Sequence, residues 1–259
     1  GPCTMAAGDT QEVVVAELAA GGQAGISNLQ AVELLKNYDI AAQDLFDKLF
    51  VVPAPPPPPI VEVTELDNKV VLNWGANVDR VRETETSSTE GYVFQGYNVY
   101  QLPSPSAQLE EATRLATFDI IDKGIPVKII KDKVIDPATG AEVEVIVQYG
   151  NDTGIERQYV AEVDFINQGG LINGTSYYYA VTAYSYNEDL LANPRTLENT
   201  LIIFEAVPQT PDPGVRYSSE VGGTAPNVTK TGTADASIDV SIVDPTDLTG
   251  HAYEVYFNT

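Results

Sequence analysis

The stretch LINGTSYYYAVTAYSYN, residues 171–187, decides the fold of this chain. Asn173-Gly174 is a turn signal, and the residues that follow it alternate strictly between two faces. One face carries Tyr177, Tyr179, Val181 and Ala183, and the other carries Tyr178, Ala180, Thr182 and Tyr184. Aromatic and β-branched side chains with a period of two predict a β-strand, and we expect this strand to belong to a β-sandwich.

Two earlier stretches extend this pattern. They are VVLNW at residues 70–74 and GYVFQGYNVYQ at residues 91–101. Together with the turn and strand at 171–183, and in this order, they resemble the phrases of a fibronectin type III domain. The resemblance covers residues 60–208 and implies a mainly β fold, a fibronectin type III-like β-sandwich. It implies a core that contains Trp74, Tyr97, Val99, Tyr177, Tyr179 and Val181.

The matched region is longer than a single domain of this family, which needs about 100 residues. We therefore expect an insertion at about residues 125–164. It contains two alternating runs, VKIIKDKVID and AEVEVIVQYG, separated by residues 137–140. This pattern predicts an added β-hairpin.

The N-terminal segment, residues 1–52, is expected to form a strand at 11–18 and an amphipathic helix. Ser27 begins the helix, with Gln30 in the capping-box position, and the helix is expected to end near Phe50. Its apolar stripe contains Leu29, Val32, Leu35, Tyr38, Ala42, Leu45, Phe46 and Leu49. A stripe this wide must be covered by the sandwich, by an upstream domain or by a neighbouring subunit. The candidates for assembly contacts are Leu35, Tyr38, Leu45, Phe46 and Leu49.

Two segments read as connections. Residues 53–59, nearly all proline, predict a polyproline II spacer, and residues 209–233 predict a linker. Residues 234–259 then begin a further β-domain, with strands at 236–243 and 251–257. Because a lone hairpin is marginal in water, these strands need backbone partners. The partners would come from a longer chain of which this is a fragment, from residues 13–15, or from the next copy in an assembly.

Charge and composition exclude several classes of function. The chain carries 37 acidic and 14 basic residues, a net charge of −23, spread along its whole length. Such a field repels nucleic acid and anionic membranes. No stretch is apolar enough to predict membrane insertion. The single cysteine, Cys3, allows no intrachain disulfide.

No constellation of reactive residues stands out. His251 is the single histidine, so neither a nucleophile–histidine pair nor a zinc site is indicated, and no phosphate-binding glycine motif occurs. We predict no catalytic residue and no cofactor, with calcium as the alternative because oxygen ligands occur in expected loops. The calcium candidates, which do not follow the usual loop spacing, are Asp119, Asp122, Asp136, Asn187, Glu188 and Asp189.

Four phrases also resemble passages of large exported proteins of Bacteroidetes and Chlorobi type, which carry type III repeats and often use type IX secretion. They are GPCTMAAGDTQEVV (1–14), VVPAPPPPP (51–59), VTELDNKVVLNWG (63–75) and SIVDPTDLTGHAYEV (241–255). The resemblance implies a bacterial protein that is extracellular or bound to the cell surface.

We therefore predict a non-enzymatic structural or adhesion module of a multidomain protein. Its partners would be neighbouring domains or identical subunits, with an extracellular glycan or protein as a further ligand. One alternative is a subunit of an extracellular filament that assembles by strand addition and helix packing. The other is an accessory module of a secreted hydrolase.

Overall fold

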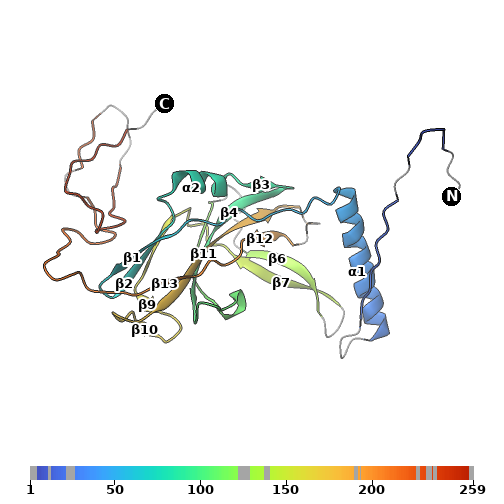
Figure 1. Ribbon diagram of the computed structural model, residues 1–259, viewed down its shortest axis with the longest axis horizontal. Coiled ribbons are helices and arrows are strands. Elements are labelled where there is room, and N and C mark those ends of the chain that lie inside the picture. The colour runs from blue at the N-terminus through green and yellow to red at the C-terminus, as the bar shows by residue number, and fades with distance from the viewer. Residues whose placement is uncertain are drawn as a thin grey trace. The chain divides into compact units, whose positions relative to one another are not determined.

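The structure, a computed structural model, describes residues 5–10, 13–21, 27–121, 129–136, 141–189, 192, 194–225, 228–231, 235 and 238–256. The chain divides into two compact units, Gly1–Pro53 with Lys131–Val145 and Ala54–Ile130 with Ile146–Thr259. Over the described residues it is mainly β, with two α-helices and antiparallel sheets that are consistent with a β-sandwich (Figure 1).

Two main sheets and one small two-stranded sheet build the larger unit. The first has the order β1-β2-β8, in which β1 (Glu62–Leu66) and β8 (Gln158–Ala161) both pair antiparallel with β2 (Lys69–Asn73). Asn68, at the turn between β1 and β2, has a φ of 54°, a left-handed conformation that asparagine tolerates better than most residues. β2 contains the predicted VVLN run, and Trp74 follows it directly.

The second sheet is centred on two long strands, β4 (Tyr92–Leu102) and β11 (Tyr177–Asn187), which lie side by side (Figure 1). The far edge of β11 pairs with β12 (Thr196–Glu198) and β13 (Phe204–Ala206). The far edge of β4 pairs with β3 (Ser88–Thr89) and β5 (Thr113–Asp119). The remaining short elements are α2 (Val78–Glu85), a 3-10 turn at Leu109–Glu111, β9 (Val163–Asp164) and β10 (Gly169–Gly170).

The core lies between these two sheets, because its main cluster takes side chains from both. Val70, Leu72 and Trp74 come from β2 and its end, and they pack with residues of β4 and β11. The residues of that second group are Phe94, Tyr97, Val99, Tyr177, Tyr179, Val181 and Ala183. All six core residues expected from the sequence are in this cluster.

An ion pair closes one end of the core. Glu85, at the end of α2, accepts two hydrogen bonds of 2.7 Å from Arg157 and one of 3.1 Å from the hydroxyl of Tyr97. Burial and the neighbouring Glu85 carboxylate together raise the pKa of Tyr97, so the hydroxyl remains a donor. The bidentate pair therefore connects α2, the segment before β8 and the core.

Tyr177 forms a corner at the start of β11. Its hydroxyl accepts a hydrogen bond of 3.0 Å from the backbone N–H of Ile172, five residues upstream. Its ring is buried in the core. A tyrosine at this place, bonded back to the chain before it, is a recurring feature of Greek-key sandwiches.

Replacing Tyr177 with phenylalanine is expected to lower the free energy of unfolding by about 1 to 3 kcal/mol, because the N–H of Ile172 loses its acceptor while the ring is kept. Urea denaturation of both proteins measures this difference. Tyr149→Phe, at an exposed tyrosine, is the matched control and is expected to change little. An equal loss of unfolding free energy in the two variants would contradict a stabilising role for the Tyr177 hydrogen bond.

The expected insertion is a hairpin, as predicted. β6 (Ile129–Ile135) and β7 (Glu142–Tyr149) form a two-stranded sheet of their own, and Asp136 donates its backbone N–H to Ala141 at 2.9 Å. The insertion is shorter than predicted, however. β8 falls inside the range 125–164, yet it pairs with β2 and belongs to the sandwich.

The stretch expected to form a polyproline spacer, residues 53–59, is partly buried. Pro56 and Pro59 are buried, and the Thr84 hydroxyl of α2 donates to the carbonyl oxygen of Pro57 at 3.0 Å. Proline has no N–H, so such a run packs against a surface without leaving an unpaired donor.

The predicted helix is α1 (Asn28–Asp47), and both bonds of the predicted capping box between Ser27 and Gln30 are present. The helix ends three residues before Phe50, because Leu49 and Phe50 have φ values of 53° and 62°. The N–H of Phe50 then bonds to the carbonyl of Leu45 at 2.8 Å, which satisfies an otherwise unpaired group of the last turn. Among the described residues, no helix is both long and apolar enough to cross a membrane.

The described residues of the three expected terminal strands do not form strands, which corrects three expectations. Described residues 13–18 contain no strand, and Val13 and Val15 are exposed. Described residues 238–243 and 251–256 contain only an isolated bridge, between Ser241 and Thr224. Residues 240–242 exchange backbone hydrogen bonds with residues 222–225 of the expected linker. Those groups are therefore not available to residues 251–256.

Candidate functional site

The outer face of the six-stranded sheet carries a buried network of polar side chains. A second apolar cluster lies on this face, formed by Tyr100, Leu102, Ala107 and Ala180. Leu201 and Ile203, on the segment between β12 and β13, pack against it. Both faces of β4 and β11 are therefore covered by other parts of the chain. Nearly every residue of these two strands is buried, although their sequences alternate between two kinds of side chain.

A pair of amides anchors the base of the inserted hairpin to this face. The side chain of Asn98 in β4 donates to Gln148 in β7 at 3.1 Å, and Gln148 donates back at 2.9 Å. Thr117 adds a bond of 2.8 Å to Asn98, and Arg114 adds one of 3.2 Å to Gln148. Asn98 and Gln148 are buried, so each bond replaces one to water and the cluster is satisfied internally.

Glu198 joins the same cluster from β12. Its Oε1 accepts hydrogen bonds from the Asn98 amide at 3.0 Å, from the Tyr100 hydroxyl at 2.9 Å and from the Thr182 hydroxyl. Burial, followed by the negative charge of Glu198, raises the pKa of Tyr100, so this hydroxyl remains a donor. The three donors come from the two long strands β4 and β11, which hold the carboxylate in one orientation.

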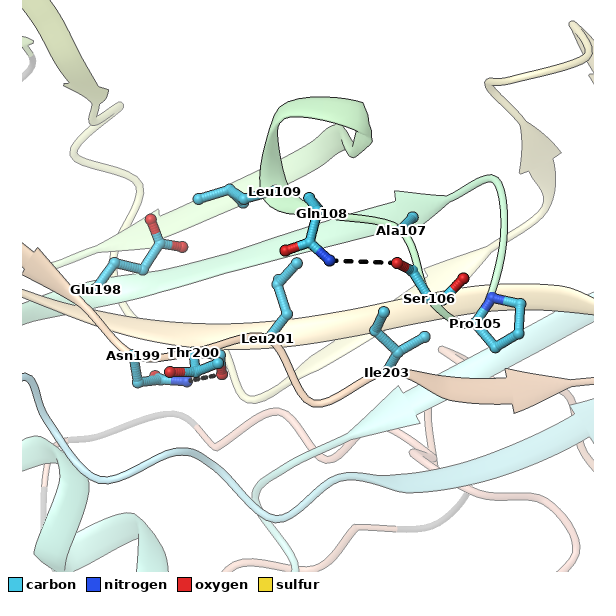
Figure 2. A pocket seen from close by; sticks show the side chains of 10 residues that line it. All are labelled: Pro105, Ser106, Ala107, Gln108, Leu109, Glu198, Asn199, Thr200, Leu201 and Ile203. Carbon is cyan, nitrogen blue, oxygen red and sulfur yellow. Dashed lines mark hydrogen bonds between the residues drawn. The ribbon is translucent and has the colours of Figure 1, made fainter.

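A pocket of about 410 Å³ opens beside Glu198 (Figure 2). Figure 2 shows Glu198 at one end and Pro105 at the other, with Leu201 and Ile203 between them. The amide nitrogen of Gln108 donates to the Ser106 carbonyl at 3.3 Å. The pocket is lined by Pro105, Ser106, Ala107, Gln108, Leu109, Glu198, Asn199, Thr200, Leu201 and Ile203.

The site offers a ligand one charge, several hydrogen-bonding groups and apolar contact. It presents one carboxylate and several amide and carbonyl groups beside an apolar wall, but its lining contains no histidine, cysteine or lysine that would act as a base or nucleophile. Sequence reasoning missed Asn98, Gln148 and Glu198. The sequence did contain a signal for a buried polar cluster, because Asn98 and Thr182 are polar residues within two strand-forming runs rich in tyrosine.

A second buried polar group, Asp164, holds the turn after β9. Its carboxylate accepts bonds from the Gln101 amide at 2.9 Å, from the Asn167 amide at 2.8 Å and from the backbone N–H groups of Ile166 and Asn167 at 3.0 Å. Burial is the largest single influence and raises the pKa of Asp164, but these hydrogen bonds together bring it below its ordinary value.

The lowered pKa of Asp164 predicts a dependence of stability on pH. The unfolded carboxyl titrates near 3.9, so its contribution is fully present above about pH 4 and is lost as the pH falls through the folded pKa. Asp164→Asn is expected to be less stable at neutral pH and to lose less further stability below about pH 4. Urea midpoints measured from neutral to acidic pH test this. Asp39→Asn, on α1, is the control. If its loss of stability at acidic pH is as small as that of Asp164→Asn, then Asp164 is not the source of the dependence on pH.

Asp119, a calcium candidate, is used by the chain itself. Its buried carboxylate accepts backbone N–H bonds from Asn151 at 3.0 and 3.1 Å and from Asp152 at 2.9 Å, which organises the loop after β7. Burial raises the pKa of Asp119, against the lowering by those backbone bonds.

The other calcium candidates lie on different elements or outside the described residues. Asp136 follows β6, while Asn187 ends β11 and accepts from the N–H of Asp189 at 3.0 Å. Glu188 and Asp189 are exposed beside it, and Asp122 lies outside the described residues, as does Cys3. Among the described residues, no three acidic, histidine or cysteine side chains form a group that would hold a metal ion.

Four of the five assembly candidates lie on α1, where no residue is fully buried, and Leu49 follows the end of the helix. Leu35, Tyr38, Phe46 and Leu49 are exposed, and Leu45 is half-buried. The rings of Phe46 and Phe50 are in edge contact, with centroids 6.1 Å apart, so part of the stripe is covered within the helix end itself.

Comparisons of the chain with protein-family models, with curated proteins and with solved structures gave no significant match.

Proposed function

We propose that this chain is a non-enzymatic structural or adhesion module of an exported bacterial surface protein, built on a fibronectin type III-like sandwich. The observation that carries the proposal is the Tyr177 corner at the start of β11, beside a core shared by two antiparallel sheets. This combination occurs in many extracellular and cell-surface sandwiches, including fibronectin type III domains. The likeness is one of fold, and it supports function by analogy.

The described polar clusters support the same proposal. Asn98, Gln148 and Glu198 bond to one another and to the sheet, and Asp119 and Asp164 bond to loop backbone. Side chains committed in this way fix the end of β7 and the loops on the sheets. A rigid framework that presents loops is the requirement of a spacer or adhesion module.

Cell-surface exposure is the test of this proposal. An antiserum against residues 54–259 is applied to intact cells that make the protein, to their medium and to lysed cells. We expect a signal on intact cells or in the medium, and we expect external protease to remove the cell-bound signal. A cytoplasmic protein of the same cells is the control for lysis. A signal that appears only after lysis would overturn the proposal.

A filament subunit remains the second candidate because α1 exposes apolar side chains. The filament hypothesis combined strand addition with helix packing. The described residues of the expected terminal strands do not form strands, so helix packing is the mode of assembly that we propose to test. Light scattering of residues 1–259 is expected to show assembly that Leu35→Asp with Leu45→Asp prevents, because charges on the stripe oppose apolar contact. Gln43→Asp, an added charge on the same helix, is the control. A folded monomer at high concentration would exclude the filament.

A further inference from the structure

Within the described part of the chain, the carboxylate of Glu198 is hydrogen-bonded through one of its two oxygens. Its Oε1 receives all three hydrogen bonds, from Asn98, Tyr100 and Thr182. Its Oε2 receives none from the described residues, and Glu198 lines the pocket. A carboxylate has acceptor capacity on both oxygens, so this arrangement leaves Oε2 able to accept from a ligand.

No positive charge in the described part of the chain pairs directly with Glu198. The guanidinium of Arg114 bonds to Gln148 and lies over the ring of Tyr149, 5.7 Å from its centroid. Its link to Glu198 therefore runs through Gln148 and Asn98. A half-buried carboxylate without a direct ion pair is the strongest single attraction this pocket offers to a cation.

The rest of the pocket suits an apolar stem. Leu109, Leu201 and Ile203 line it between Glu198 and Pro105, over a volume typical of small ligand sites (Figure 2). In Figure 2 the amide oxygen of Gln108 is turned toward the Glu198 end, so a second acceptor lies on that side. A ligand with a charged nitrogen at Glu198 and a short chain of CH₂ groups along the apolar wall would match both the carboxylate and the wall of the pocket.

We propose that this pocket binds the side chain of a lysine carried by a partner protein, with its ammonium group on Glu198. A guanidinium is matched by a carboxylate that offers both oxygens, and here Oε1 is already occupied by three donors. An ammonium is a compact charge with three freely rotating donors, so it can pair with the one open oxygen of Glu198 without needing the other. The net charge of −23 further attracts a basic partner.

The test is a titration of the full chain, followed by ¹H–¹⁵N NMR, with the peptide acetyl-Gly-Lys-Gly-amide at millimolar concentrations. We expect shifts of the Asn199, Thr200 and Leu201 amides. The same peptide with Nε-acetyllysine, or with arginine in place of lysine, is expected to bind at least about tenfold more weakly, because the first has no charge and the second needs two oxygens. Equal binding of all three peptides, or no shift at these amides, overturns the proposal. Binding of n-butylammonium that is tighter than that of the lysine peptide overturns the assignment to a partner's lysine.

Two variants assign the contact to residues. Glu198→Gln keeps an amide oxygen for the three donors but removes the charge, and it is expected to weaken lysine-peptide binding about tenfold. Glu205→Gln, at an exposed glutamate of β13, makes the same change of charge outside the pocket and is expected to bind as the wild type does. If Glu198→Gln does not fold, Leu109→Ala, at an exposed wall residue, is expected to weaken binding several-fold. Wild-type affinity in a folded Glu198→Gln, or in Leu109→Ala where that variant replaces it, overturns the proposal.

Discussion

Replacing Trp74 with alanine is expected to lower the free energy of unfolding by about 3 to 5 kcal/mol, as truncation of a large core side chain does. Trp74 is 1 % exposed and contacts the rings of Tyr97 and Phe118, with centroids 5.7 and 6.0 Å away. It follows β2 and packs against residues of the opposite sheet, so its removal leaves a cavity between the two sheets. Urea denaturation monitored by far-ultraviolet circular dichroism measures the loss.

Trp74→Phe separates packing from hydrogen bonding. Among the described residues, no acceptor bonds to the indole Nε1 of Trp74. Phenylalanine keeps an aromatic ring and removes this unpaired donor, so we expect it to cost clearly less than alanine. A loss under about 1 kcal/mol for Trp74→Ala would contradict the core position, because such small losses belong to surface sites.

Replacing Gly96 with alanine is expected to cost about 3 kcal/mol, the upper part of the range for an overpacked core. An added Cβ would lie 2.4 Å from the carbonyl oxygen of Phe118, 2.9 Å from Cα of Asp119 and 3.0 Å from a ring carbon of Tyr184. Two of these atoms are backbone of the neighbouring strand β5, which moves only if the β4–β5 pairing opens. Gly96 also lies next to the irregularity in the β4–β11 register at Tyr184.

Gly169→Ala is the matched control for Gly96. A Cβ at Gly169, in β10, would meet no atom within 4 Å, and we expect a change within about 0.5 kcal/mol. Thermal or urea unfolding of both variants gives the comparison. If the two alanines cost the same, then the backbones of β4 and β5 are farther apart at Gly96 than the structure places them.

Local signals predicted the elements that depend on local contacts. Ser27 and Gln30 are three residues apart, so their capping box needs nothing but the helix itself. The tyrosine-rich run at 177–187 became a strand because its period and its turn are written into neighbouring residues. The terminal runs at 238–256 show the limit of this reasoning. An alternating sequence becomes a strand only where another backbone pairs with it, and residues 240–242 are paired with residues 222–225.

Burial was predictable for one face of the sheet and not for the other. The core residues Trp74, Tyr97 and Tyr179 are large side chains in alternating runs, which mark an inner face. The outer face is buried as well, because the chain returns over it with the segment after β12 and with the base of the β6–β7 hairpin. The alternation of residues in β4 and β11 does not reveal that other segments of the chain cover their outer face.

The sequence by itself determined that this protein has long aromatic strands, a capped helix and an inserted hairpin, since each of these depends on residues close together in the chain. Only the tertiary structure decided where the polar site lies. Asn98 meets Gln148 across 50 positions and Glu198 across 100, and the three come together because the sheet and the hairpin fix their register. Hydrogen bonds between such distant residues follow from how the backbone is arranged in space, and local periodicity carries no information about that arrangement.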